Sequence, residues 1–181
     1  MKAKLIAASI ALAASSGAYA ANYVAQIEVN AAGASAQLNQ IGQIFQSVIC
    51  APNTAVVFNH SNTNVRGVYC TTRSDLDPGN AAVNGKTIRF NYSAIDGSAS
   101  GIHYVARQLD RQFIDIDNCP TSTAPATVTC ATALVDRKPV AGSSDVEPAL
   151  FFGDNAPPVG DVTAADLANL NVSATPKITA R

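Results

Sequence analysis

The segment that decides the fold is 24–48, which reads VAQIEVNAAGASAQLNQIGQIFQSV. Its first part alternates apolar and polar residues as far as Asn30, as a half-buried β-strand does. Small residues follow in a turn, Gly33-Ala34-Ser35, and Ser35 lies where an N-cap is expected. Apolar residues then recur at three- and four-residue spacing, which predicts an amphipathic helix buried through Leu38, Ile41, Ile44, Phe45 and Val48.

The same order of strand, small-residue turn and helix recurs along the chain. A strand pattern at 87–93 leads through Gly97-Ser98-Ala99-Ser100-Gly101 into an apolar helical stretch at 102–109, and 139–141 leads into Gly142-Ser143-Ser144-Asp145, where a short helix is expected to start. Further β-segments are expected at 54–59, 66–72 and 113–116, a small excursion at 127–134, and a last helix at 163–170 capped by Thr163. This order predicts an α/β fold with a mixed, mostly parallel sheet flanked by helices.

The amino terminus has the pattern of a secretory signal peptide. Lys2 and Lys4 precede an apolar run from Leu5 to Ala14, and an A-x-A end follows at 18–20. We expect residues 1–20 to be removed and 21–181 to fold as one domain in the periplasm or outside the cell. The run is too short to span a bilayer, and no later segment is long and apolar enough. The alternative is a buried amino-terminal helix.

Cysteine usage agrees with export. The four cysteines, Cys50, Cys70, Cys119 and Cys130, are even in number and contain no C-x-x-C pair, so disulfides are expected rather than a zinc site. Four cysteines permit three pairings. The local pairing, Cys50–Cys70 with Cys119–Cys130, is preferred because each pair closes a short loop between neighbouring elements.

Composition excludes several classes of function. The chain has 12 Lys+Arg against 13 Asp+Glu, a formal charge of −1, and no basic stripe, so nucleic acid is not an expected partner. Hydrophobic residues make up 48% of the chain, which argues against disorder. Arg66, Arg73 and Arg89 on β-segments are expected to be solvent or rim charges, and no cofactor is expected.

The three serine-containing turns are the strongest functional signal. Each places glycine and hydroxyl groups at an expected helix start, where free backbone N–H groups favour an anion. Three such turns meeting at one sheet edge could surround a tetrahedral oxyanion without any lysine or arginine among them. The alternative is that each turn only caps its helix.

These motifs resemble those of bacterial periplasmic phosphate-binding proteins, the type 2 substrate-binding components of phosphate ABC transporters. The resemblance covers roughly residues 24–176 and corresponds to the first lobe of that two-lobed family, so a second lobe is expected to be missing from this chain. It implies a transporter permease as partner and inorganic phosphate or a similar oxyanion as ligand. The implied ligand-binding residues are Ser35, Ser98, Ser100, Gly101, Ser144 and Asp145.

The resemblance gives Asp145 a specific role. A carboxylate can accept a hydrogen bond from protonated phosphate, whereas it repels fully ionised sulfate, so Asp145 is expected to favour phosphate. Ala99 stands where the family has a ligand-binding serine, and Ser100 is the expected substitute.

Two other functions stay open. A secreted structural or interaction module would need no small ligand. A hydrolase is the weaker alternative, because Ala99 occupies the nucleophile position of G-x-S-x-G. His103, expected to be a surface or packing residue, has no placed nucleophile to activate. The sequence therefore predicts a binding protein and not an enzyme.

Overall fold

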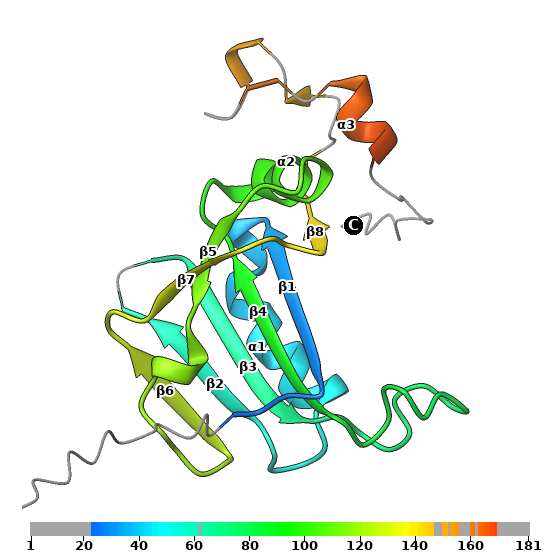
Figure 1. The fold of residues 1–181 in the computed structure, drawn as a ribbon, viewed down its shortest axis with the longest axis vertical. Coiled ribbons are helices and arrows are strands. Elements are labelled where there is room, and N and C mark those ends of the chain that lie inside the picture. Colours follow the sequence, from blue (N-terminus) through cyan, green and yellow to red (C-terminus); the bar gives the residue numbers. More distant parts are fainter. Residues whose placement is uncertain are drawn as a thin grey trace, which may run out of the picture.

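The computed structural model describes residues 23–61, 63–146, 150–151, 153–155, 160–161 and 163–169. The expected signal peptide at 1–20 and the stretch near 176 lie outside these residues. The described part is an α/β fold built on one six-stranded sheet (Figure 1). Helix α1 (Leu38–Ile44) lies against one face, and a ribbon of two strands crosses the other face.

The sheet is mixed, as predicted. Its strand order is β6-β2-β3-β4-β1-β8, with bounds of Ala126–Cys130, Val56–His60, Val65–Thr71, Thr87–Ser93, Ile27–Gly33 and Ala141–Ser143. The pairs β6–β2, β4–β1 and β1–β8 are parallel, while β2–β3 and β3–β4 are antiparallel. Strands β2 and β3 must be antiparallel because only residues 61–64 connect them, too few for a crossover.

The helix predicted after the first turn is present, but fewer of its apolar residues face the sheet than the sequence predicts. A 3-10 turn (η1, Ser35–Gln37) leads into α1, and a π-helical turn (η2, Phe45–Ile49) continues it. Phe45 stacks on Phe90 of β4 with 4.1 Å between ring centroids. Ile44 and Val48, expected to be buried, are 47% and 53% exposed. The wider π turn changes the angular spacing after Ile44, so Val48 no longer lies above the sheet.

The other face of the sheet is covered by β5 (Arg111–Ile114), β7 (Leu134–Arg137) and the 3-10 turn η4 (Ile116–Asn118). Strands β5 and β7 pair antiparallel. The largest core cluster lies beneath them and includes Phe58, Val65, Ile114, Ile116 and Val128. The prediction of a small excursion at 127–134 is wrong in part, because the first residues of this stretch belong to β6, which extends the main sheet beside β2.

Both disulfides of the predicted local pairing are present. Cys50–Cys70 joins the end of the first helix to β3, and Cys119–Cys130 joins η4 to β6. Such bonds form and persist in oxidising compartments, which agrees with an exported protein. Within the described ranges, no helix is long and apolar enough to cross a membrane.

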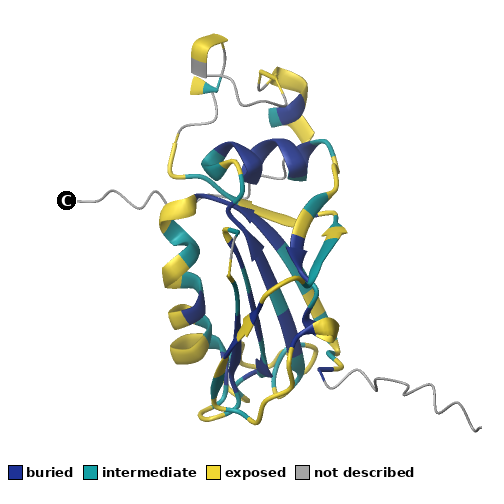
Figure 2. Cartoon of the chain, turned by 90° about the vertical axis from the view of Figure 1, so that its left-hand side faces the viewer, coloured by how far each residue is buried: buried dark blue, intermediate teal, exposed yellow. Residues whose placement is uncertain are grey.

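Two short helices lie at one end of the sheet. The 3-10 turn η3 (Gly97–Ala99) leads into α2 (Ser100–Ala106), in which every residue except the half-buried Val105 is buried (Figure 2). Further along lie the 3-10 turn η6 (Gly153–Asn155) and α3 (Ala164–Asn169). Thr163 caps α3 as predicted, since its Oγ1 accepts from the Asp166 N–H at 3.2 Å while its own N–H donates to the Asp166 carboxylate at 2.9 Å.

Candidate functional site

The three serine-containing turns lie at one edge of the sheet. Strands β4, β1 and β8 are neighbours and run parallel, so their carboxyl ends point the same way (Figure 1). Gly33 at the end of β1 is in register with Ser143 at the end of β8, and β4 continues through a tight turn into η3 and α2. We call this region, the residues 33–35, 97–101 and 142–145, the turn edge.

Glycine brings two of these turns into backbone contact. A Cβ atom built on Gly101 would overlap the backbone of Ser143, and one built on Gly142 would overlap the backbone of Gly101. Gly101 is buried in this contact. Its absent side chain therefore lets α2 lie directly on β8.

A hydrogen bond joins the second turn to the third. The Ser98 hydroxyl donates to the Asp145 carboxylate. Ser98 is half-buried and Asp145 is exposed, so the pair lies at the surface of the turn edge. The remaining acceptor capacity of Asp145 is accessible to solvent or to a ligand.

The hydroxyls of Ser100 and Ser144 are used within their own turns. Ser100 is 1% exposed and its Oγ donates to the Gly97 carbonyl at 2.9 Å. Ser144 Oγ donates to the Val146 carbonyl at 2.6 Å and accepts from the Val146 N–H. Neither hydroxyl has a proton left for a ligand. The short helix expected to start at the third turn is replaced at its beginning by β8, and residues 147–149 are not described.

Tyr92, which the sequence reasoning missed, supports the turn edge from below. Its hydroxyl donates to the Ala34 carbonyl at 2.9 Å and lies 2.9 Å from Ser143 Oγ. Burial raises the pKa of Tyr92 above its ordinary value, the Ser143 bond opposes this, and Asp145 raises it further. The phenol therefore stays protonated and ties the first turn to the third.

Ser35 faces a separate hollow. The residue before η1 is Ala34, and no side chain caps the turn, so the prediction that Ser35 is an N-cap is wrong. Ser35 instead lines a hollow of about 480 Å³ between α1 and the β2–β3 connection, together with Leu38, Asn39, His60, Ser61, Thr63, Asn64, Val65 and Arg66. A smaller hollow of about 160 Å³ shares Asn39 and Arg66 with it.

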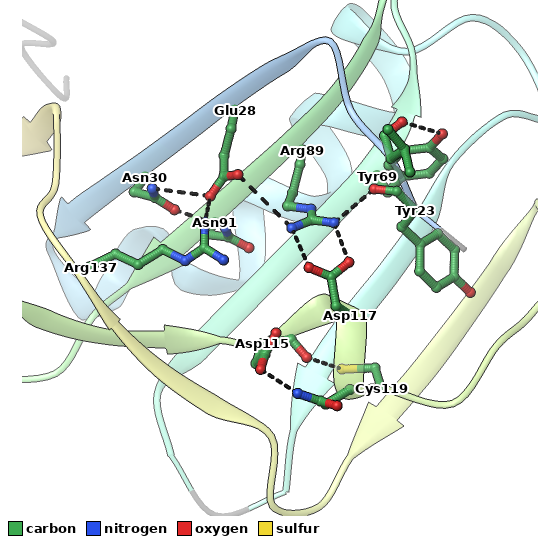
Figure 3. Close-up of polar contacts among 12 residues, drawn as sticks. Tyr23, Glu28, Asn30, Tyr69, Arg89, Asn91, Asp115, Asp117, Cys119 and Arg137 are labelled. Atoms are coloured by element: carbon green, nitrogen blue, oxygen red, sulfur yellow. Dashed lines mark hydrogen bonds and ion pairs between the residues drawn. The ribbon is translucent and has the colours of Figure 1, made fainter. Parts of the chain in front are cut away.

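Arg89 corrects another expectation, because it is a buried residue and not a solvent charge. It points from β4 towards η4, where Asp117 holds it with bonds of 2.6 and 3.0 Å, and the Tyr23 carbonyl accepts a third bond at 2.8 Å (Figure 3). Glu28 lies 3.9 Å away and also pairs with Arg137 of β7. Arg73, by contrast, is exposed and paired with Asp75.

His103, expected to be a surface or packing residue, is a packing residue. His103 is completely buried and neither ring nitrogen has a hydrogen-bond partner in the described part of the chain. No group of three or more His, Cys, Asp or Glu side chains there could hold a metal ion. Among the described residues, those of the turn edge and of the two hollows are the candidates for contact with a ligand.

Comparison with known proteins adds no family. No family model matches the sequence, and no curated protein or solved structure is significantly similar to it. The ligand-binding roles of Ser35, Ser98, Ser100, Gly101, Ser144 and Asp145 therefore stay predictions.

Proposed function

We propose that this chain is a periplasmic oxyanion-binding lobe that takes a phosphate-like anion at the turn edge and delivers it to an ABC transporter permease. The observation that carries the proposal is the hydrogen bond between Ser98 and Asp145, which joins two of the three turns at the surface. The parallel order β4-β1-β8 supports it, because ligands of open α/β sheets bind beyond the carboxyl ends of the strands.

Asp145 supplies the selectivity. A monohydrogen phosphate carries a proton that it can donate to an exposed carboxylate, and sulfate has none at neutral pH. Ser98 can turn its hydroxyl from Asp145 to the anion, or hold the carboxylate in place while the backbone N–H groups of the turns bind the anion. Ser100 and Ser144 contribute only their backbone in either case, because their hydroxyls are already bonded.

The test is an NMR titration of the full secreted chain with phosphate and, separately, with sulfate. With no cation in the three turns, we expect weak phosphate binding, on the order of millimolar. The amide shifts should concentrate at residues 97–101 and 142–145, and sulfate should cause little change.

Two variants separate the proposal from non-specific anion effects. Asp145→Asn should reduce the preference for phosphate over sulfate, and Asp75→Asn, at an exposed pair on a distant loop, should not alter it. Equal affinity for both anions in the wild-type chain would reject Asp145 as the discriminator. No shift at the turn edge with either anion would favour an interaction module without a small ligand.

A further inference from the structure

The α1 face of the sheet carries a polar groove that shares Ser35 with the turn edge but that the turn-edge proposal does not otherwise use. The larger hollow lies between the start of the first helix and the β2–β3 connection, and the smaller hollow continues beneath α1 past Gly42 to Gln46. Its floor comes from β2, β3 and β6, at Asn59, Arg66 and Thr127. We call the two hollows together the Arg66 groove.

We propose that the Arg66 groove is a second binding site, for a small polyhydroxylated anion such as a sugar acid or a sugar phosphate. Arg66 supplies the charge. The other described arginines, Arg73, Arg89, Arg107, Arg111 and Arg137, each pair with a carboxylate. Arg66 has no ion pair among the described residues, and none of those lining the groove is Asp or Glu.

The floor of the groove has polar atoms without partners. Asn59 and Arg66 face each other in the β2–β3 register, and both Asn59 Oδ1 and Arg66 Nε are buried with no hydrogen-bond partner among the described residues. Buried polar atoms are normally bonded, so this pair calls for water or a ligand in the groove. The stem of Arg66 runs beneath α1, where a Cβ on Gly42 would lie 3.9 Å from Arg66 Cδ.

The walls suit hydroxyl groups. Ser35, Asn39 and Gln43 form a polar stripe on the helix, opposite the Ser61 hydroxyl. The nearby Thr63 hydroxyl lies 3.2 Å from His60 Nδ1. Amides and hydroxyls each offer both donors and acceptors, as the hydroxyls of a sugar do. An arginine fork fits a carboxylate or a phosphate with two bonds. The groove therefore combines an arginine that can bind an anion with amides and hydroxyls that can bind sugar hydroxyls.

The test is a titration of the full chain with glucuronate, glucose 6-phosphate, glucose and inorganic phosphate, followed by amide NMR shifts. We expect at least one of the two sugar anions to bind at least tenfold more tightly than glucose and inorganic phosphate, with shifts at 35–43 and 59–66. Which of the two binds distinguishes a carboxylate from a phosphate ligand. The proposal is overturned if glucose or inorganic phosphate binds as tightly as both sugar anions, or if no probe shifts these residues.

Variants locate the charge. Arg66→Gln should abolish the preference for the anion, while Arg73→Gln, the same change at an exposed arginine, should leave it intact. Asn39→Asp places a negative charge in the groove at an exposed helix position and should weaken binding tenfold or more without disturbing the fold. Unchanged anion binding in both groove variants would reject the site. Asp145→Asn should have no effect here, so this result is independent of the turn edge.

Discussion

The Arg89 guanidinium and the Asp117 carboxylate form a two-bonded ion pair that joins the centre of the sheet to η4. The Arg89 side chain is 7% exposed and that of Asp117 is 35% exposed, so solvent reaches the acid but hardly the base. The pair therefore compensates a buried cation whose other partners are the Tyr23 carbonyl and the more distant Glu28 carboxylate.

Removing the acid should leave that cation poorly compensated. We expect Asp117→Asn to lower the free energy of unfolding by about 3 kcal/mol, at the low end for a broken buried pair because Asp117 is partly exposed. Urea denaturation measures the loss. Asp75→Asn removes the acid of an exposed pair and should cause no measurable change. Similar results for the two variants would show that Arg89 is adequately solvated without Asp117.

Two helical glycines should respond to alanine with opposite signs. Gly101→Ala forces a Cβ into the Ser143 backbone and should destabilise the protein by about 1–3 kcal/mol, or separate α2 from β8. Gly42→Ala has room, with its nearest neighbour Val57 Cγ1 at 3.6 Å, and should stabilise α1 by roughly 0.5–1 kcal/mol. Thermal unfolding of both variants compares them directly, and a stabilised Gly101→Ala would disprove the close contact.

Much of the fold could be predicted because its signals are local. The alternation of apolar and polar residues predicted β1 and β4, and the three- and four-residue spacing of apolar residues predicted the first helix. The short loops between cysteines favoured the two disulfides that are present. What covers the second face of the sheet is not a local property. Arg89 alternates with Ile88 and Phe90 like a solvent residue, but in the structure it is buried and bonded to Asp117 of η4 and to the Tyr23 carbonyl.

The candidate site was predictable in position but not in detail. Parallel strands imply that the turns share one edge, and they do. Which partner each serine hydroxyl bonds depends on turn geometry that sequence spacing does not reveal. The Ser100 hydroxyl, for example, donates to the Gly97 carbonyl within its own turn. The sequence predicted Arg66 only as a solvent or rim charge and not as a ligand-binding residue, because its lack of a carboxylate partner is a property of the packed structure.

Asp166 should hold α3 onto α2 without contributing to the core. Its carboxylate accepts two bonds of 2.7 Å from Arg107 and also caps its own helix. Asp166→Asn should release α3, so that its amides exchange roughly tenfold faster or more while the sheet amides keep their protection. Arg107 holds the pKa of Asp166 well below its ordinary value. In the wild-type chain α3 should thus stay docked at pH 5 and loosen only as the pH falls below about 4.

His103 should make the folded state sensitive to mild acid. Burial, reinforced by the nearby charge of Arg107, lowers its pKa below the ordinary value, and Asp166 and Asp161 oppose this only in part. The unfolded chain therefore takes up a proton near pH 6.5 while the folded chain does not, so stability is lost as the pH falls from about 6.5 towards the folded pKa. One such group changes the free energy of unfolding by at most ~1.4 kcal/mol per pH unit.

Urea denaturation at pH 7.5 and 5 measures this slope. His103→Leu should flatten it, whereas an unchanged slope in His103→Leu would assign the acid sensitivity to another group.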